Sequence, residues 1–290
     1  MTFETPTALD YFASLVADDA TLPLVEAAVS IAQDDFPRLD TQAVLAEIDT
    51  LAMRLKQRFP ADAVAVQRLR CLNRFFFQEL GFGGNVNNFY DPDNSYLHRV
   101  LQTRRGIPIT LAILYTELAR QIGLVARGIS FPGHFLIKLR MSTGRQQGEV
   151  VIDPFTGHSL SRDELDELLA PYKRNRGLHG DFDVPLGLFL QAATDREVVA
   201  RLLRNLKEIH RSAQDRRRVL QVQERLVVLL PQAWEERRDR GFAHADLGAC
   251  EAAARDLSDY LEHAPDAGDR TLVAERLAAL GSNGGPLRLH

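Results

Sequence analysis

Residues 104–124 read RRGIPITLAILYTELARQIGL, and two shorter apolar runs follow, HFLIKLR at 134–140 and EVVIDPF at 149–155. Pro108 suits the first turn of a helix, where its missing N–H is not needed, and Gly123 suits the helix stop. Between them the chain is apolar on nearly every side. A helix of this kind is expected inside a core.

The segments after this helix are typical of β-structure. Apolar runs are separated by Pro132-Gly133 and by a polar stretch at 142–148, and both are turn signals. We therefore expect strands near 124–131, 134–140 and 149–153. A buried helix followed by a small antiparallel sheet indicates an α+β core.

The first 80 residues favour helices, expected at 7–18, 22–34, 41–59 and 62–80, because apolar residues recur there at helical spacing. The composition changes at residues 81–96, GFGGNVNNFYDPDNSY, which are rich in turn-forming residues. So long a loop is often functional. The alternative is a structural crossing whose aromatic side chains pack on the core.

The C-terminal part is again helical after residue 161, with a polar connection at 171–185. Pro231 and Pro265 stand 34 residues apart, and Gly241 and Ala253 occupy positions where tetratricopeptide repeats favour small residues. A helical bundle with chance spacing is the alternative. We expect two domains, 1–180 with the α+β core and its N-terminal helices, and 181–290 with helical repeats.

Composition excludes several classes of protein. The 290 residues carry 35 Lys and Arg against 39 Asp and Glu, a net charge of −4, which disfavours a bulk nucleic-acid binder. Two cysteines give neither a disulfide framework nor a zinc pattern. The beginning of the chain does not look like a signal peptide, and no apolar run has the length of a membrane span. We expect a cytoplasmic protein that binds neither membranes nor nucleic acid.

His134 and Asp153 are the candidate catalytic residues, because consecutive antiparallel strands can place them side by side. An Asp that accepts a hydrogen bond from one imidazole nitrogen fixes the tautomer and orients the ring. In a cysteine-dependent enzyme the other nitrogen faces a thiol at a helix N-terminus. The same pair can also serve as a purely structural polar link.

These features together resemble the bacterial SirB branch of the transglutaminase-like superfamily, in which a papain-type core precedes tetratricopeptide-type repeats. The resemblance covers roughly residues 40–280 and implies the fold. The matching stretches are 72–75, 90–92, 94–97, 104–109, 131–135, 152–155, 205–207, 224–226 and 236–241.

The resemblance places Pro108 where the catalytic members of the superfamily have cysteine. It therefore favours a non-catalytic interaction or regulatory module with no cofactor and no metal, whose protein partner binds the C-terminal repeats. The alternative is an amide hydrolase or acyl-transferase that uses His134 and Asp153 with an unrecognised nucleophile. Cys71 and Thr110 are the substitutes considered, although both suit packing roles better.

Six further residues are candidates for ligand binding. Arg104 and Arg105 precede the helix N-terminus and could attract an anion, or they could form ion pairs with Asp91 and Asp93. The candidates from the loop are Tyr90, Asp91, Asn94 and Tyr96.

Overall fold

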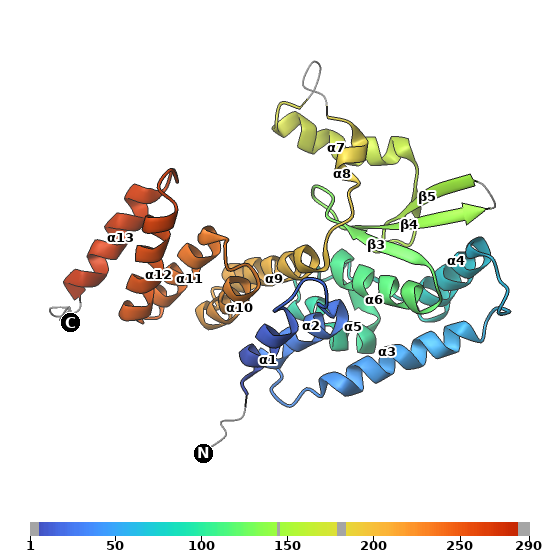
Figure 1. Cartoon of the computed structure of the whole chain (residues 1–290), viewed down its shortest axis with the longest axis horizontal. Helices are drawn as coiled ribbons and strands as arrows, with labels where there is room; N and C mark the ends of the chain where they lie inside the picture. Colours follow the sequence, from blue (N-terminus) through green and yellow to red (C-terminus); the bar gives the residue numbers. More distant parts are fainter. Residues whose placement is uncertain (1–5, 144–145, 179–183, 284–290) are drawn as a thin grey trace. The chain divides into compact units, whose positions relative to one another are not determined.

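The computed structural model describes residues 6–143, 146–178 and 184–283. The chain divides into two compact units, one of Asp19–Leu202 and one of Met1–Asp18 with Leu203–His290. The first is an α+β unit and the second is helical (Figure 1), which confirms the expected fold class. The expected domain boundary at 180/181 lies outside the described residues.

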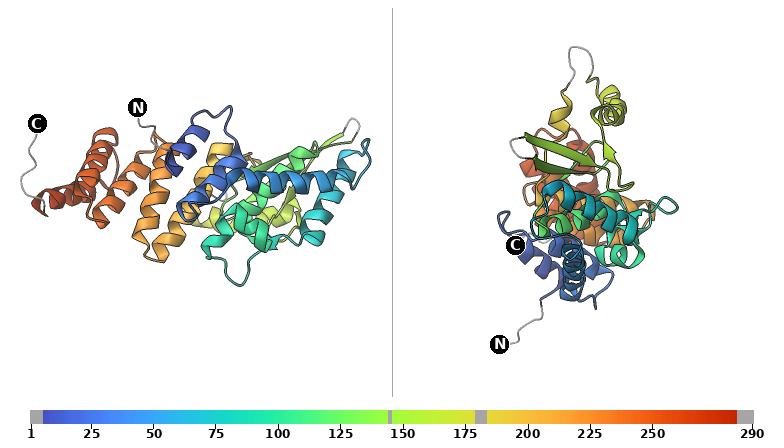
Figure 2. Two further views of the ribbon diagram at one scale, coloured as in Figure 1. Left: turned by 90° about the horizontal axis from the view of Figure 1, so that it is seen from below. Right: turned by 90° about the vertical axis from the view of Figure 1, so that its right-hand side faces the viewer.

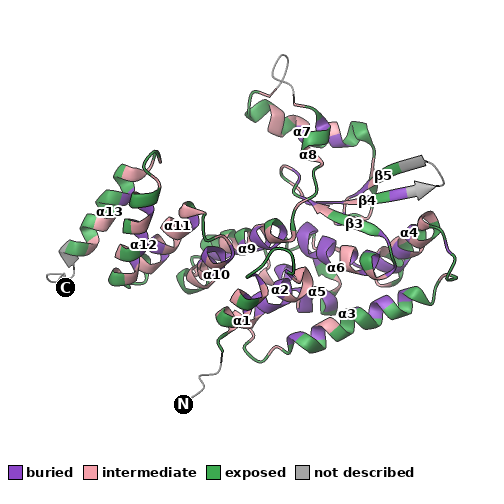
Figure 3. Cartoon of the chain, in the orientation of Figure 1, coloured by how far each residue is buried: buried purple, intermediate pink, exposed green. Residues whose placement is uncertain are grey.

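Helices α2 (Leu24–Ser30), η1 (Ile31–Asp34) and α3 (Thr41–Lys56) begin the α+β unit. Asp40 caps α3 by accepting the Ala43 N–H at 3.1 Å. In Figure 3 the buried residues of α3 form a stripe on an otherwise exposed helix. The expected apolar face of this helix is therefore confirmed.

The expected helix at 62–80 is instead divided into α4 (Ala65–Asn73) and a π-helical segment, η2 (Arg74–Glu79). A turn closed by the Ala63 N–H and the Pro60 carbonyl, 3.0 Å apart, delays the start of α4. Gly81, at φ +72°, ends the helical run as expected.

Helix α6 (Pro108–Gln121) is the central helix of the unit, and ten of its residues are buried. Figure 3 shows it coloured as buried along most of its length. Pro108 occupies its first turn, and Gly123, at φ +76°, terminates it. Both sequence signals acted as expected.

The main sheet has the order β3-β4-β5-β6 and is antiparallel throughout. The strands are β3 (Val125–Ile129), β4 (Leu136–Thr143), β5 (Gln146–Ile152) and β6 (Ser159–Leu160). The β4–β5 hairpin is longer than expected, because its ladder extends to the pair Thr143–Gln146. The helices α7 (Arg162–Asn175) and α8 (Leu186–Phe189) supply Leu165, Leu169 and Leu186 to the core on one face.

A second, parallel pair of strands joins the loop at 81–96 to the start of α6. It consists of β1 (Gly83–Gly84) and β2 (Arg105–Gly106). The short helices η3 (Pro92–Ser95) and α5 (Leu97–Thr103) lie between these strands in sequence. The loop is thus tied to the end of α6 that carries Pro108.

The second unit contains α1 (Ala8–Leu15), the end of α9 (Asp195–Ser212), α10 (Arg216–Leu229), α11 (Trp234–Asp246), α12 (Cys250–His263) and α13 (Arg270–Asn283). The bounds of α10 and α12 are related by an offset of 34 residues, as expected from Pro231 and Pro265. Helices α12 and α13 pack side by side (Figures 1 and 2).

Helix α1 belongs with these helices rather than with the α+β core, which differs from the expected grouping. It packs on α10, where the buried Arg225 guanidinium lies 4.9 Å from the centre of the Phe12 ring. This pairing brings together residues far apart in the sequence, so local patterns could not predict it.

Candidate functional site

His134 and Asp153 lie side by side at the ends of neighbouring strands. His134 Nε2 is 3.0 Å from Asp153 Oδ1, and the two side chains are 26% and 14% exposed. An ionised carboxylate only accepts hydrogen bonds, so Nε2 carries the hydrogen and Nδ1 keeps the lone pair in a neutral ring. The expected juxtaposition is therefore present in the structure.

The Asp153 carboxylate is held by the loop that follows β5. Oδ1 also accepts the Phe155 N–H at 2.8 Å, and Oδ2 accepts the Thr156 hydroxyl at 2.9 Å. Burial alone would raise the pKa of Asp153, but the hydrogen bonds from His134, Phe155 and Thr156 outweigh it and lower this pKa. The carboxylate is thus ionised at neutral pH.

The backbone of His134 is fixed by a turn and by an arginine distant in sequence. Gly133 adopts φ +72°, and the His134 N–H donates to the Phe131 carbonyl at 3.0 Å. Arg201 Nη2 donates to the His134 carbonyl at 2.7 Å, and its Nη1 donates to Ser130 Oγ at 2.6 Å. Burial lowers the pKa of Arg201. Sequence reasoning missed this positioning residue, since it lies on α9.

Three positions were considered for the nucleophile: Pro108 by the resemblance, and Thr110 and Cys71 as its substitutes. Pro108 is buried in the first turn of α6. The Thr110 hydroxyl donates to the Asn94 carbonyl at 2.8 Å and to the Ile107 carbonyl at 3.0 Å. Cys71 is half-buried on α4, and burial raises the pKa of its thiol. Across the described residues, the one side-chain hydrogen bond of His134 is to Asp153.

Asn94 is the residue that organises the loop at 81–96. Its side-chain amide donates to the Asn88 carbonyl at 2.7 Å and accepts from Asn85 Nδ2 at 3.0 Å. Its own carbonyl accepts the Ile107 N–H at 3.3 Å as well as the Thr110 hydroxyl. Only 3% of Asn94 is exposed. This buried position indicates that Asn94 holds the loop against α6 rather than contacting a ligand.

The same loop reaches the segment that carries Asp153. The Gly84 N–H donates to the Phe155 carbonyl at 3.0 Å. A Cβ on Gly84 would lie 2.2 Å from the Phe155 ring, so this close approach requires glycine. Hydrogen bonds therefore connect the loop at 81–96 both to the start of α6 and to the segment that carries Asp153.

The other candidate residues of the loop differ in their exposure to solvent and in their contacts. Tyr90 is 75% exposed, whereas Tyr96 is buried and donates its hydroxyl hydrogen to Asp35 at 2.6 Å. Asp91 caps η3 by accepting the Asp93 N–H at 3.0 Å and also accepts from Asn88 Nδ2. Tyr90 is the candidate with a side chain available at the surface.

Arg104 and Arg105 are not paired with the acidic residues of the loop in the described chain. Asp93 pairs instead with Arg99 at 3.2 Å. Arg104, at φ +61°, packs its guanidinium 4.8 Å from the centre of the Phe82 ring, and burial lowers its pKa. Arg105 Nη1 donates to the Gly81 carbonyl. Both arginines therefore stabilise the start of the loop.

Within the described ranges, no three His, Cys, Asp or Glu residues are grouped as metal ligands would be. No helix in these ranges has the length and apolar character needed to cross a membrane.

Comparison with known proteins gives two domain matches. A family model described as the transglutaminase-like superfamily matches residues 42–204, and a tetratricopeptide repeat model matches residues 206–278. The helical repeats expected from the 34-residue spacing are thereby confirmed.

Bacterial relatives match over nearly the whole chain. A UPF0162 protein of Xylella fastidiosa is 35% identical over 268 residues, covering 91% of this chain and 92% of the relative. A UPF0162 protein of Pseudomonas aeruginosa is 29% identical, covering 89% and 90%. Protein SirB1 of Salmonella typhimurium is 26% identical, covering 80% and 82%. No solved structure matches the chain.

Proposed function

This chain belongs to the transglutaminase-like superfamily and, within it, to the bacterial family of UPF0162 proteins and SirB1, and from this premise we propose that it is a non-catalytic interaction module. In this role the α+β unit keeps the His134–Asp153 pair as a structural link, and the repeats bind a protein partner. No cofactor or metal takes part, and the chain acts in the cytoplasm without binding nucleic acid.

One observation carries the non-catalytic part of this role. Pro108 begins α6, and among the described residues no Cys, Ser or Thr side chain forms a hydrogen bond with His134. Covalent catalysis of acyl transfer needs a nucleophile in contact with its base. Proline has neither an ionisable group nor an N–H and cannot act as that nucleophile. Its presence supports a structural role for the His134–Asp153 pair.

A groove in the repeat unit supports the binding part of this role. Its volume is about 510 Å³, and its walls come from α9, α10 and α11. Lys207, Arg211 and Arg216 line it together with the apolar Val219 and Phe242. A concave helical surface with apolar contacts and charged edges is typical of peptide-binding repeats.

Affinity capture with the full chain, followed by mass spectrometry and measurement of binding with the purified candidate, tests this role. Arg211→Glu reverses a charge in the groove, and Arg255→Glu makes the same change on exposed α12, outside the groove. We expect Arg211→Glu to lose the partner and Arg255→Glu to retain it. Equal binding by both variants, or the absence of any reproducible partner, would contradict the assignment.

A second candidate function, an amide hydrolase or acyl-transferase, is supported by the His134–Asp153 hydrogen bond itself. The imidazole is oriented as a general base, with Nδ1 free of hydrogen-bond partners among the described residues. In this alternative His134 activates water or a nucleophile that sequence and geometry do not identify. An activity assay with a His134 variant separates the two functions.

A further inference from the structure

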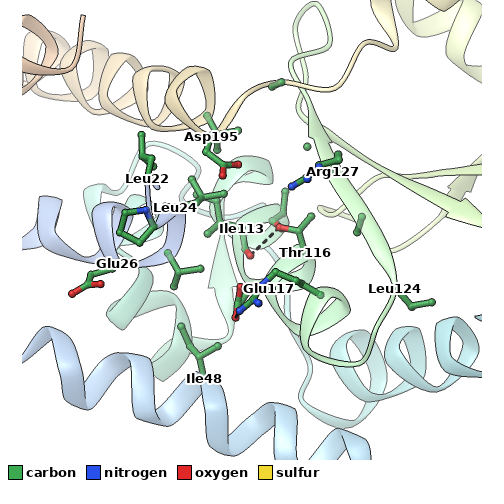
Figure 4. A pocket seen from close by; sticks show the side chains of 18 of the residues that line it. Leu22, Leu24, Glu26, Ile48, Ile113, Thr116, Glu117, Leu124, Arg127 and Asp195 are labelled. Atoms are coloured by element: carbon green, nitrogen blue, oxygen red, sulfur yellow. Dashed lines mark hydrogen bonds and ion pairs between the residues drawn. The ribbon is translucent and has the colours of Figure 1, made fainter. Parts of the chain in front are cut away.

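The α+β unit contains a cavity of about 560 Å³ whose described lining includes neither His134 nor Asp153 (Figure 4). Its walls come from α2, α3, α6, β3 and the start of α9. The volume lies in the range of binding sites, about 300–1,000 Å³. The large apolar residues of the lining, referred to below as the cavity floor, include Leu22, Ile48, Ile113, Leu124, Phe135 and Val198.

The cavity runs along the open edge of the sheet. β3 is the outermost strand, since its one partner in the sheet order is β4. Five consecutive residues, from Leu124 to Gly128, line the cavity. A cavity over one face of a strand would touch alternate residues, because successive side chains point to opposite faces. Contact with every residue therefore indicates contact with the edge.

Backbone groups on this edge are available for pairing. The Gly128 carbonyl faces away from β4, because it accepts the Ala193 N–H at 2.9 Å. In a strand the N–H and C=O of one residue point the same way, as do those of the residue two positions along. The N–H and C=O of Ala126 therefore face the cavity too. In the described chain, the bond from Ala193 is the one backbone hydrogen bond on this side.

Asp195 adds a negative charge to the cavity. It is half-buried, and within the described residues its carboxylate has no hydrogen-bond or ion-pair partner. Burial raises the pKa of Asp195, and attraction to the exposed Arg127 offsets part of this effect. The other three carboxylates of the lining have hydrogen-bond partners: Glu117 accepts from Arg120 at 2.6 Å, Asp49 from Gln121 at 2.7 Å and Glu26 from Gln42 at 3.0 Å. Among the carboxylates that line the cavity, Asp195 is therefore the one whose charge is available to pair with a cationic side chain of a ligand.

We propose that this cavity binds an extended peptide segment, which pairs with the edge of β3, places an apolar side chain on the cavity floor and places a Lys or Arg side chain beside Asp195. Backbone pairing supplies affinity in this mode of recognition, and side-chain pockets supply specificity. Ala193 already uses one edge carbonyl in the same way. This site is separate from the groove of the repeats and extends the proposed function to a second binding surface.

The probe that tests this site is a displayed library of random heptapeptides, selected on the full-length protein. One enriched peptide is then synthesised with a fluorophore, and its affinity is measured by polarisation. We expect the enriched peptides to combine apolar residues with a Lys or Arg. A second version of the peptide, N-methylated at alternate amides, reports on pairing with the edge of β3.

Three variants of the protein separate the contributions. Asp195→Asn removes the charge at nearly constant volume, and Asp163→Asn makes the same change in the first turn of α7, at an exposed position outside the cavity. Ala126→Pro removes an N–H that points out from an edge strand, where proline is tolerated. We expect Asp195→Asn and Ala126→Pro each to weaken binding about tenfold, and Asp163→Asn to leave it unchanged.

The site is overturned if the library yields no enriched peptide. It is equally overturned by a selected peptide that binds Asp195→Asn as tightly as the unaltered protein. If Ala126→Pro does not fold, as judged by circular dichroism, the N-methylated peptide decides the question of edge pairing. Binding unaffected by N-methylation would exclude that pairing.

Discussion

Asp153 Oδ1 receives two hydrogen bonds, one from His134 Nε2 at 3.0 Å and one from the Phe155 N–H at 2.8 Å. A single carboxylate oxygen thereby joins the turn before β4 to the loop after β5. The backbone of Phe155 also accepts from Gly84, so the link continues into the loop that adjoins α6. The His134–Asp153 pair has a structural role whether or not it has a chemical one.

Asp153→Asn is expected to destabilise the protein by about 1–3 kcal/mol at pH 7, because it removes charge-assisted hydrogen bonds from a mostly buried site. The folded-state pKa of Asp153 lies below its ordinary value. This part of the stability is therefore present above the unfolded pKa of about 3.9 and is lost as the pH falls through the folded pKa. Urea unfolding at pH 7 and pH 3 measures this contribution to the free energy of unfolding.

The difference in unfolding free energy between the unaltered protein and Asp153→Asn should narrow at pH 3. The exposed Asp163→Asn serves as the control and should differ little from the unaltered protein at either pH. A constant difference at both pH values would show that the charge of Asp153 contributes nothing.

Asn94→Ala is expected to destabilise the protein by about 1–3 kcal/mol, since it removes the hydrogen bonds that the buried Asn94 side chain makes with Asn85, Asn88 and Phe89. Asn87→Ala is the matched control, because Asn87 is exposed and has no hydrogen bond among the described residues. Hydrogen exchange of the amides at 85–94 should accelerate in the first variant alone. Similar exchange in both variants would remove the organising role assigned to Asn94.

The buried helix and the sheet were predictable because their signals are local. Pro108 and Gly123 bound α6, and alternation with turn residues marks the strands. The end of the β4–β5 hairpin was misplaced, since the polar residues from Ser142 onward gave no sign that the ladder continues. The juxtaposition of His134 and Asp153 was predictable because consecutive strands pair.

The supporting residues were not predictable in the same way. Asn94 is one of four asparagines in the loop, all with the same local preference for turns. Its burial depends on contact with Thr110 and Ile107, which come later in the chain. Arg201 reaches His134 from α9, and no spacing rule relates residues so distant. Such contacts are set by tertiary packing.

Gly241→Ala is expected to destabilise the repeat unit. An added Cβ would lie 2.8 Å from Leu257 Cδ2 and 3.2 Å from Asp256 Cβ. The resulting overpacking costs about 1–3 kcal/mol, against a gain in helix propensity of up to about 1 kcal/mol. Gly281→Ala in α13 is the control, since an added Cβ there has no neighbour within 4 Å. In thermal unfolding, the melting temperature should fall for Gly241→Ala and stay unchanged for Gly281→Ala. An unchanged melting temperature for Gly241→Ala would mean that α12 shifts freely.

The protein is expected to show no cysteine-dependent amide hydrolysis or amine incorporation. By the family resemblance, the catalytic thiolate would stand at the N-terminus of α6, where this chain has Pro108. Loss of a nucleophile can remove ~10⁶-fold of turnover in a serine protease, so water positioned by His134 is a poor substitute. Cys71 is half-buried on α4, and its raised pKa leaves little thiolate at neutral pH. Assays with the purified full chain and with His134→Ala should both give the background rate, and iodoacetamide should change neither. Turnover that disappears in His134→Ala and is blocked by iodoacetamide would show that a thiol reaches this histidine after all.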